Sequence, residues 1–208
     1  MNALILANGL PPSKALARRA KRQADLIVCA DGGANHAHRL GLRPDAIVGD
    51  LDSIRASARK RFAKVPTVRL RSQYSTDLEK AIRYCLRRGA RSVTVLGATG
   101  GRIDHAAGNL GCFKKFGRRC GLSFVDDDGE LLMVGRQITL ASRTGDLVSL
   151  MPLGRCTGVT TRHLLYRLTN GALELGVREG TSNRATGATV TVSVRSGTLL
   201  LYKMRRRP

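Results

Sequence analysis

Short apolar runs alternate with helical stretches over the first 128 residues. Each run is four to six residues long, is flanked by polar or glycine positions, and is followed by a segment with helical spacing of its apolar residues. This alternation predicts a parallel β-sheet with helices on both faces. The expected strands are Ala3–Ala7, Asp25–Ala30, Ala46–Gly49, Thr67–Leu70, Ser92–Leu96 and Leu122–Val125. The expected helices are 13–23, 36–40, 55–62, 76–88 and 105–116.

The pattern changes from about Gly129 onward. Helical periodicity disappears, and short strand-like runs are separated by glycines, as is typical of a small all-β sandwich. The expected strands are Leu131–Val134, Gln137–Leu140, Leu147–Leu150, Gly158–Thr161, Ala172–Leu175, Thr189–Val194 and Thr198–Tyr202. The polar stretch Gly180–Asn183 is expected to be a loop. We therefore expect an α/β domain over residues 1–128, followed by a β-sandwich over residues 129–208.

Composition excludes several classes of protein. No run of 18 apolar residues exists, so no membrane span is expected. The first residues lack the features of a signal peptide. The five cysteines are odd in number and form no C-x-x-C motif. They are expected to be reduced and buried in a cytoplasmic protein.

The formal net charge is +21, from 36 basic and 15 acidic residues. Residues 1–128 hold 24 basic and 11 acidic side chains, and residues 129–208 hold 12 and 4, so the excess covers the whole chain. Such a charge attracts polyanions in general, weakly and in a salt-dependent manner. Aromatic residues are only 4% of the chain and no nucleic-acid-binding motif is present, so no specific nucleic acid is expected.

Two carboxylates follow the expected strand Ala46–Gly49 closely. Asp50 and Asp52 would project from its carboxyl end, where open α/β sheets bind ligands. Neighbouring acids repel each other, and a hard cation such as Mg²⁺ would relieve the repulsion and bring substrate phosphates with it. The alternative interpretation is a helix N-terminus in which Asp52 or Ser53 is the cap.

Three further motifs place polar groups at the same edge. Asp31 with two glycines follows the second strand, Asp77 opens a helix, and the glycine-rich turn 97–101 precedes Arg102. Thr76 and Glu79 form a capping-box pattern, and Asp77 could merely favour the helix dipole. Together the acids predict an Mg²⁺–nucleotide site for phosphoryl-type transfer, although the P-loop motif is absent. The four histidines lack zinc-ligand spacing, and His105 could simply pack at a helix start.

Five motifs resemble those of thiamine pyrophosphokinases and occur in the family's order. They are Asp31–Asn35, Gly49–Ser53, Gln73–Asp77, Gly100–His105 and Gly180–Asn183. The resemblance implies an α/β domain plus a β-sandwich in a homodimer with active sites at the subunit interface. It also implies transfer of pyrophosphate from ATP to the hydroxyl of thiamine, with release of AMP.

The resemblance also assigns residues. The implied Mg²⁺ ligands are Asp50, Asp52 and Asp77, with Asp31 as a further catalytic residue. The implied ATP-binding residues are Gly32, Gly33, Asn35, Thr76, Lys80, Thr99, Gly100, Gly101 and Arg102. The implied substrate-binding residues are Asp104, His105, Thr181, Ser182 and Asn183, with Tyr166 as a candidate aromatic face for the cationic thiazolium.

Some features leave alternatives open. The family often has Leu-Trp near its last strand, whereas this chain has Leu201-Tyr202 and no tryptophan. Tyr166 could be a half-buried sandwich tyrosine, and Asp104 could serve only to pair with Arg102. Two other functions stay in view: diphosphate transfer to another alcohol such as a hydroxymethylpterin, and a basic nucleic-acid-binding protein.

Overall fold

The computed structural model describes residues 1–70 and 74–206 of the chain and divides into two compact units. The first unit is Met1–Asp127 and the second is Asp128–Pro208. The division lies one residue before the expected boundary. Each unit has its own hydrophobic core and is described by itself.

The first unit contains a parallel sheet in the order β6-β5-β1-β2-β3-β4. All of its neighbouring strands pair in parallel, as the alternating pattern predicted. The strands are β1 (Asn2–Leu6), β2 (Leu26–Ala30), β3 (Ala46–Gly49), β4 (Thr67–Arg69), β5 (Ser92–Leu96) and β6 (Gly121–Val125). Because the strands run in one direction, their carboxyl ends share one edge, and the predicted site residues follow those ends.

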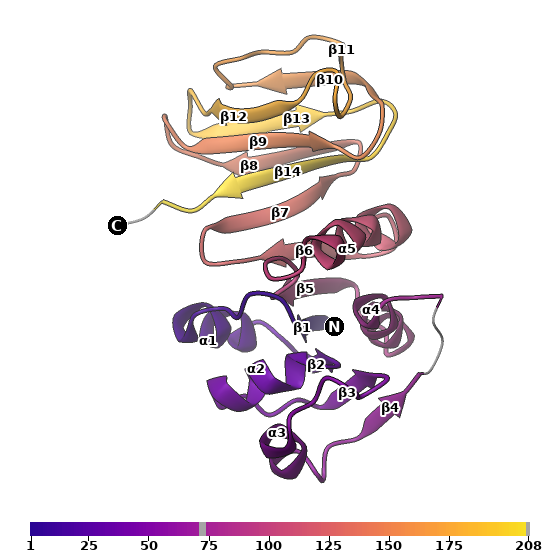
Figure 1. Cartoon of the computed structure of the whole chain (residues 1–208). Coiled ribbons are helices and arrows are strands. Elements are labelled where there is room, and N and C mark those ends of the chain that lie inside the picture. The colour runs from indigo at the N-terminus through magenta and orange to yellow at the C-terminus, as the bar shows by residue number, and fades with distance from the viewer. Residues whose placement is uncertain (71–73, 207–208) are drawn as a thin grey trace. The chain divides into compact units, whose positions relative to one another are not determined.

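Helices cover both faces of this sheet (Figure 1). The helices α1, α2 and α3 share a core with inward-facing residues of β1 and β2 such as Leu4, Leu6 and Ile27. On the opposite face, α4 packs against β1, β2 and β3, and α5 packs against α4. The helices are α1 (Lys14–Arg22), α2 (Gly33–Leu40), α3 (Ala56–Arg61), α4 (Asp77–Arg87) and α5 (Ile103–Phe116).

Capping residues fix the helix starts that the sequence indicated. The Ser13 hydroxyl accepts a hydrogen bond from the Leu16 N–H, and the Thr76 hydroxyl accepts one from the Glu79 N–H. The Thr76 half of the predicted capping box is thus formed. The Glu79 carboxylate is paired with Lys115 Nζ at 2.5 Å. The cap at Thr76 sets where α4 begins, and therefore where Asp77 lies.

The second unit is a two-layer β-sandwich, which confirms the predicted fold class. One layer has the order β12-β9-β14-β7 and the other β11-β10-β13-β8. Apolar residues of both layers form one core cluster. The strands are β7 (Gly129–Val134), β8 (Gln137–Ala141), β9 (Leu147–Pro152), β10 (Cys156–Arg162), β11 (Gly171–Leu173), β12 (Gly180–Arg184), β13 (Thr189–Ser193) and β14 (Leu199–Met204).

One expectation for this unit is wrong. The segment Gly180–Asn183, expected to be a loop, belongs to β12 and pairs with β9. The pairing register shifts between Gly180 and Asn183, and Ser182 adopts a φ of 58°. The strand is therefore bulged. Its polar composition hid it because it lacks the apolar alternation of an ordinary strand.

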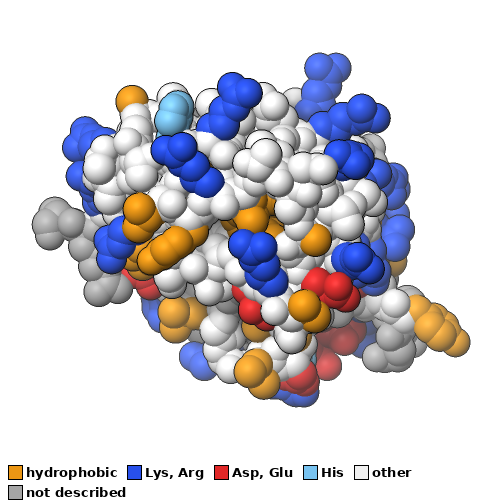
Figure 2. Space-filling view, turned by 90° about the horizontal axis from the view of Figure 1, so that it is seen from above, with side chains coloured by type: hydrophobic (Ala, Val, Ile, Leu, Met, Phe, Trp, Pro, Cys, Tyr) orange, Lys and Arg blue, Asp and Glu red, His pale blue; other side chains and the backbone are white. Residues whose placement is uncertain are grey.

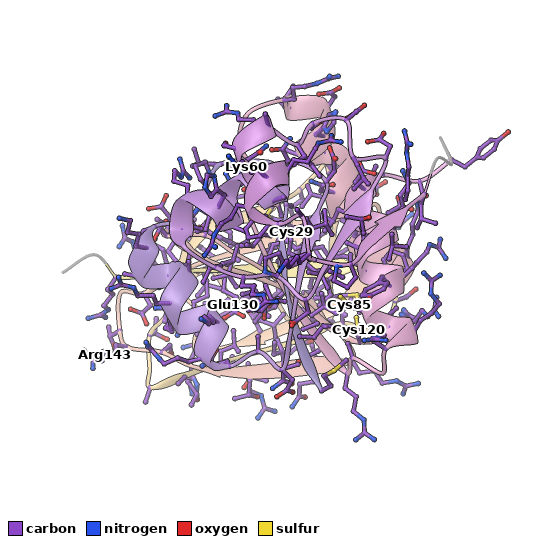
Figure 3. All side chains as sticks on the ribbon, turned by 90° about the horizontal axis from the view of Figure 1, so that it is seen from below. Cys29, Lys60, Cys85, Cys120, Glu130 and Arg143 are labelled. Atoms are coloured by element: carbon purple, nitrogen blue, oxygen red, sulfur yellow. The ribbon has the colours of Figure 1, made fainter. Side chains whose placement is uncertain are left out.

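Surface and interior differ sharply in charge. Figure 2 shows a face on which basic side chains predominate over acidic ones and are dispersed over uncharged surface. In the interior, Cys29, Cys85, Cys112 and Cys120 are buried free thiols, and Figure 3 marks Cys29 among the strands and Cys85 beside Cys120. No helix in the described part of the chain is both long and apolar enough to span a membrane.

Candidate active site

Three carboxylates converge at the carboxyl edge of the parallel sheet. Asp31 follows β2, Asp50 follows β3, and Asp77 is the first residue of α4. One oxygen from each lies within 4.8 Å of the others, the one such group of potential metal ligands among residues 1–70 and 74–206. Three acids held this close repel one another unless a cation lies between them. The arrangement is thus suited to a hard divalent cation.

Asp31 is the most deeply placed of the three. It is 4% exposed, and its Oδ1 atom is buried without a hydrogen-bond partner. Burial raises the pKa of its carboxyl group, and the neighbouring charges of Asp77 and Asp50 raise it further. The nearby Ser53 side chain and the Gly32 backbone N–H act in the opposite direction. A buried carboxylate oxygen without a hydrogen-bond partner, close to two other acids, has the donor chemistry of a metal ligand.

A close backbone approach brings Asp50 to the cluster. Gly49 has a φ of 156°, and a Cβ added there would lie 2.8 Å from the Asp31 Cβ and 3.2 Å from Asp77 Oδ1. Any larger residue would push the acids apart. The glycine before Asp50 is therefore a steric requirement of the cluster.

A buried lysine lies beside the acids. The Lys80 side chain is only 5% exposed, and its Nζ lies 2.9 Å from Asp77 Oδ1, one helical turn away. A desolvated ammonium needs an anionic neighbour, which Asp77 provides. Lys80 is thus placed to supply positive charge to an anionic ligand in the same space.

Asp52 is not part of this cluster. Its side chain is exposed, and its Oδ1 accepts a hydrogen bond from the Ser53 hydroxyl at 2.9 Å. The expected Mg²⁺ ligands were Asp50, Asp52 and Asp77. In the structure Asp31 takes the place of Asp52 beside the other two. The capping alternative is also not formed, because α3 is capped by Arg55 without a side-chain hydrogen bond. A ligand role for Asp52 remains a prediction.

A cleft of about 570 Å³ opens over the carboxylates. Of the expected site residues its lining contains Asp31, Asp50, Thr76, Asp77, Lys80, Gly100, Arg102 and His105. The lining also contains Asn8 and Asn109, which were given no role from the sequence, and Ser53, which was considered there as a helix cap. Asn8 follows β1 at the same sheet edge as Asp31, so the position of the strand end was the available signal. Gln73, part of one motif, lies outside the described residues.

Three other residues that were expected to bind ATP support the walls of the cleft. They are not among the described residues that line it. A Cβ on Gly33 would lie 1.9 Å from the Leu6 carbonyl oxygen, so α2 can pack on β1 only with glycine there. The Asn35 amide donates to the Ser53 carbonyl and accepts from the Arg55 N–H, both at 2.9 Å. Gly32 likewise abuts the Asn8 side chain. These residues fix the walls of the site.

The glycine-rich turn after β5 has a similar structural basis. Gly100 and Gly101 adopt φ values of 83° and 75°, and the Thr99 carbonyl accepts a hydrogen bond from the Leu10 N–H at 2.7 Å. Arg102 and Asp104 form an exposed ion pair at 2.5 Å. The hydrogen bond from Arg102 lowers the pKa of Asp104 to about 2. This is the local pairing that the sequence analysis kept as the alternative for Asp104.

The expected acceptor residues of the second unit form a separate arrangement. The Asn183 side chain is buried, and its Oδ1 accepts from the Tyr166 N–H at 3.0 Å while its Nδ2 donates to the Tyr166 carbonyl at 2.8 Å. Tyr166 itself is 67% exposed. It is not the half-buried core tyrosine of the alternative interpretation. Thr181 and Ser182 are exposed on β12 beside Asn183, and the Ser182 N–H donates to Ser149 Oγ.

Comparison with known proteins identifies related chains. A family model described as thiamin pyrophosphokinase, catalytic domain, matches residues 17–122, and one described as its vitamin B1 binding domain matches residues 136–199. Thiamine pyrophosphokinase 1 of Oryza sativa subsp. japonica is 28% identical over 88% of this chain and 80% of its own length. Thiamin pyrophosphokinase 1 of Caenorhabditis elegans is 29% identical over 96% of this chain and 87% of its own.

Solved structures share the fold. Thiamin pyrophosphokinase from Geobacillus thermodenitrificans superposes with a TM-score of 0.85 at 24% identity, covering 99% of this chain and 98% of the other. Thiamine pyrophosphokinase from Bacillus subtilis gives 0.84 at 22% identity with full coverage of both chains. At this identity the superpositions establish the fold, and the family follows from the two matched models.

Proposed function

This chain belongs to the thiamin pyrophosphokinase family, and we propose that it transfers the pyrophosphoryl group of ATP to the hydroxyl of thiamine. The products are thiamine diphosphate and AMP. The observation that carries the proposal is the cluster of Asp31, Asp50 and Asp77 in a cleft at the carboxyl edge of the sheet. The hydroxyl oxygen attacks the β-phosphorus of ATP, the bond from that phosphorus to the bridging oxygen of AMP breaks, and the hydroxyl proton is released.

We propose that Asp31, Asp50 and Asp77 hold Mg²⁺. All donor atoms of the cluster are oxygens, which suits a hard cation. The buried Asp31 Oδ1 has no hydrogen-bond partner and is therefore available to coordinate it. When bound, the ion neutralises charge on the triphosphate and orients it for displacement. Asp52, two residues after Asp50, has an exposed side chain outside this cluster, and its expected role as a further ligand stays a prediction.

The other residues of the cleft are proposed to orient the phosphates. Lys80 supplies a desolvated positive charge next to Asp77, and Thr76 and Ser75 line the cleft at the start of α4. Arg102, exposed in its pair with Asp104, can exchange that partner for a phosphate oxygen. The attacking group is the hydroxyl of the substrate, and no side-chain nucleophile takes part. The role of these residues is therefore to bind the triphosphate and to neutralise the charge on the leaving AMP and the transferred group.

The second unit is proposed to bind the acceptor. Tyr166 offers an exposed aromatic face, which attracts a cation such as a thiazolium ring. Asn183 uses its amide to hold the Tyr166 backbone and therefore acts as a positioning residue. Ser182 and Thr181 supply exposed hydroxyls, and the acceptor-binding role expected of Asp104 and His105 stays a prediction.

We further propose a homodimer in the cytoplasm. In the second unit Leu165, Tyr166, Leu175 and Val177 are large apolar residues that are more than half exposed, and contact with a second copy of the chain would bury such residues. The buried free thiols Cys29, Cys85 and Cys112 suit a reducing compartment. Light scattering on a sizing column tests the oligomeric state.

The decisive experiment measures AMP formed from ATP and Mg²⁺ with a panel of alcohols. Thiamine is expected to give stoichiometric AMP and thiamine diphosphate. A hydroxymethylpterin, which is neutral, is expected to give only the background of ATP hydrolysis. The matched control is the Asp50→Asn variant, which lacks one carboxylate of the cluster. Turnover with the pterin and not with thiamine would establish the alternative acceptor, and AMP formation with neither would refute the proposed function.

A further inference from the structure

The two helical layers of the first unit differ in charge composition. Helices α1, α2 and α3 carry five, one and three lysines and arginines, nine together, and no aspartate or glutamate. Helices α4 and α5 carry five basic and three acidic residues. The nine are Lys14, Arg18, Arg19, Lys21, Arg22, Arg39, Arg59, Lys60 and Arg61. We call the outer face of α1, α2 and α3 the basic layer.

The side chains of the basic layer are free to meet a ligand. All nine residues are exposed, and none forms an ion pair with an acid anywhere in residues 1–70 and 74–206. Arg59 donates to the Leu51 carbonyl at 2.8 Å, which leaves its charge uncompensated. By contrast, Lys80 and Lys115 of the other layer are paired with Asp77 and Glu79. The layer thus presents uncompensated positive charge.

One end of the basic layer is concave. A cavity of about 370 Å³ at the carboxyl end of α3 is lined by Arg43, Lys60, Arg61 and Lys64 together with Phe62, Ala63 and Val65. Figure 3 labels Lys60 on the helical ribbon there. Four cations and no acid around a hollow favour an anion with several oxygens, such as a phosphodiester.

The layer lacks what other polyanion binders need. None of the exposed large hydrophobic residues lies in α1, α2 or α3 or in the segment 60–65. A helix that inserts into a membrane surface needs apolar residues beside its basic ones, and a single-strand binder needs aromatic rings for stacking. What remains is a surface of lysine and arginine side chains that contacts anionic groups such as backbone phosphates through charge.

We propose that the basic layer binds the phosphodiester backbone of double-helical nucleic acid without sequence preference. Backbone contacts by lysine and arginine supply affinity and carry no sequence information. None of the nine residues lines the cleft over Asp31, Asp50 and Asp77. The inference is independent of the proposed enzymatic reaction.

The test compares two triple variants of equal net charge. The layer variant is Arg18→Gln with Lys60→Gln and Arg61→Gln. The control variant is Arg87→Gln with Arg91→Gln and Lys114→Gln, three exposed residues outside the layer. Fluorescence anisotropy measures binding of each protein to 20-base-pair DNA and RNA duplexes of two unrelated sequences over a series of salt concentrations. Melting curves and AMP formation check that both variants stay folded and active.

We expect the layer variant to weaken duplex binding about tenfold near 0.1 M salt. Its slope of log affinity against log salt should fall by up to about 3, because each phosphate contact contributes about 0.9. The control variant should change the affinity by less than about threefold. Equal binding to both duplex sequences supports the proposal, and the DNA and RNA arms identify which duplex binds better.

Several outcomes would overturn it. Equal losses in both variants would mean that net charge alone attracts the duplex. Tighter binding to a single strand, or strong preference for one duplex sequence, would assign the layer to base contacts. Binding to anionic phosphatidylglycerol vesicles without duplex binding would assign it to membranes. If the triple variant unfolds, Lys60→Gln alone, which removes one exposed side chain, is measured against Lys114→Gln.

Discussion

The first unit holds two regions of opposite charge that are built in opposite ways. At the carboxyl edge of the sheet, three acids bring their oxygens within 4.8 Å of one another, and the most buried is 4% exposed. In the basic layer, nine cations are exposed on three different helices. The acids are few and gathered by the backbone, whereas the bases are many and dispersed.

The difference shows what net charge can and cannot specify. Exposed charges are screened over about 8 Å at physiological salt, so the basic layer acts collectively and tolerates the loss of one member. Buried acids interact strongly at short range, so each member of the cluster matters. The chain has a net charge of +21, and its cluster of three carboxylates therefore forms where glycines and strand ends bring the side chains together.

The largest expected effect comes from breaking the acidic cluster. Asp50→Asn should reduce kcat/KM by roughly a hundredfold or more, since even the outer-shell partners of metal ligands commonly contribute 10 to 100-fold. Without metal the variant should melt no lower than the wild type, because it relieves repulsion and creates no cavity. Asp52→Asn is the matched control and should lose much less. An equal loss in both variants would show that Asp52 also holds the metal.

Lys80→Met tests whether the buried positive charge beside Asp77 helps to bind ATP. Removing the buried ammonium should weaken ATP binding about tenfold or more, as expected for lost hydrogen bonds to a charged group. Mg²⁺ should bind the free enzyme more tightly, because a competing cation has left Asp77. Titration calorimetry measures both constants. Lys114→Met, exposed on α5, is the control, and parallel weakening of both ligands would contradict the counter-ion role.

Gly49→Ala tests whether the backbone gathers the acids. The added Cβ would lie 2.8 Å from the Asp31 Cβ at a φ of 156°, so we expect a loss of about 1–3 kcal/mol of unfolding free energy from strain. Mg²⁺ affinity should fall with it. Urea unfolding with and without Mg²⁺ measures both. Gly108→Ala is the control, since nothing lies within 4 Å of a Cβ there. Unchanged Mg²⁺ affinity in Gly49→Ala would mean that the cluster tolerates displacement.

The layered fold could be predicted because burial leaves a repeated mark on the sequence. Most strands of the first sheet are short apolar runs, and start or stop residues mark three of the helices, Ser13 for α1, Gly41 for α2 and Thr76 for α4. The strand ends in turn located Asp31, Asp50 and Asp77. What could not be predicted depends on side-chain direction, which no one-dimensional pattern records.

Three residues show this limit. Asp52 comes two residues after Asp50, yet its side chain is exposed, and the third carboxylate of the cluster is that of Asp31. Asn35 belongs to a ligand-like motif but uses its amide on the Ser53–Arg55 backbone. Asn183 lies in a strand without apolar alternation and holds Tyr166 through two hydrogen bonds. The Asn35 and Asn183 side chains bond backbone groups, and the Asp52 carboxylate bonds the Ser53 hydroxyl, which only three-dimensional contacts reveal.

The smallest effect concerns His36 of α2, which lies under the basic layer. Burial lowers its pKa, and the neighbouring charges of Arg39 and Arg55 lower it further, while the hydrogen bond to the Gly9 carbonyl at 3.0 Å raises it. Between this lowered pKa and the ordinary value of 6.5, the unfolded chain binds more protons than the folded one. The free energy of unfolding should therefore fall as the pH drops below 6.5. His36→Gln, which can still donate to Gly9, should remove that part of the fall. Melting temperatures from about pH 7.5 to about pH 5 measure it, with His38→Gln as the control on the same helix. A slope unchanged in His36→Gln would mean that the pKa of His36 is not lowered in the folded protein.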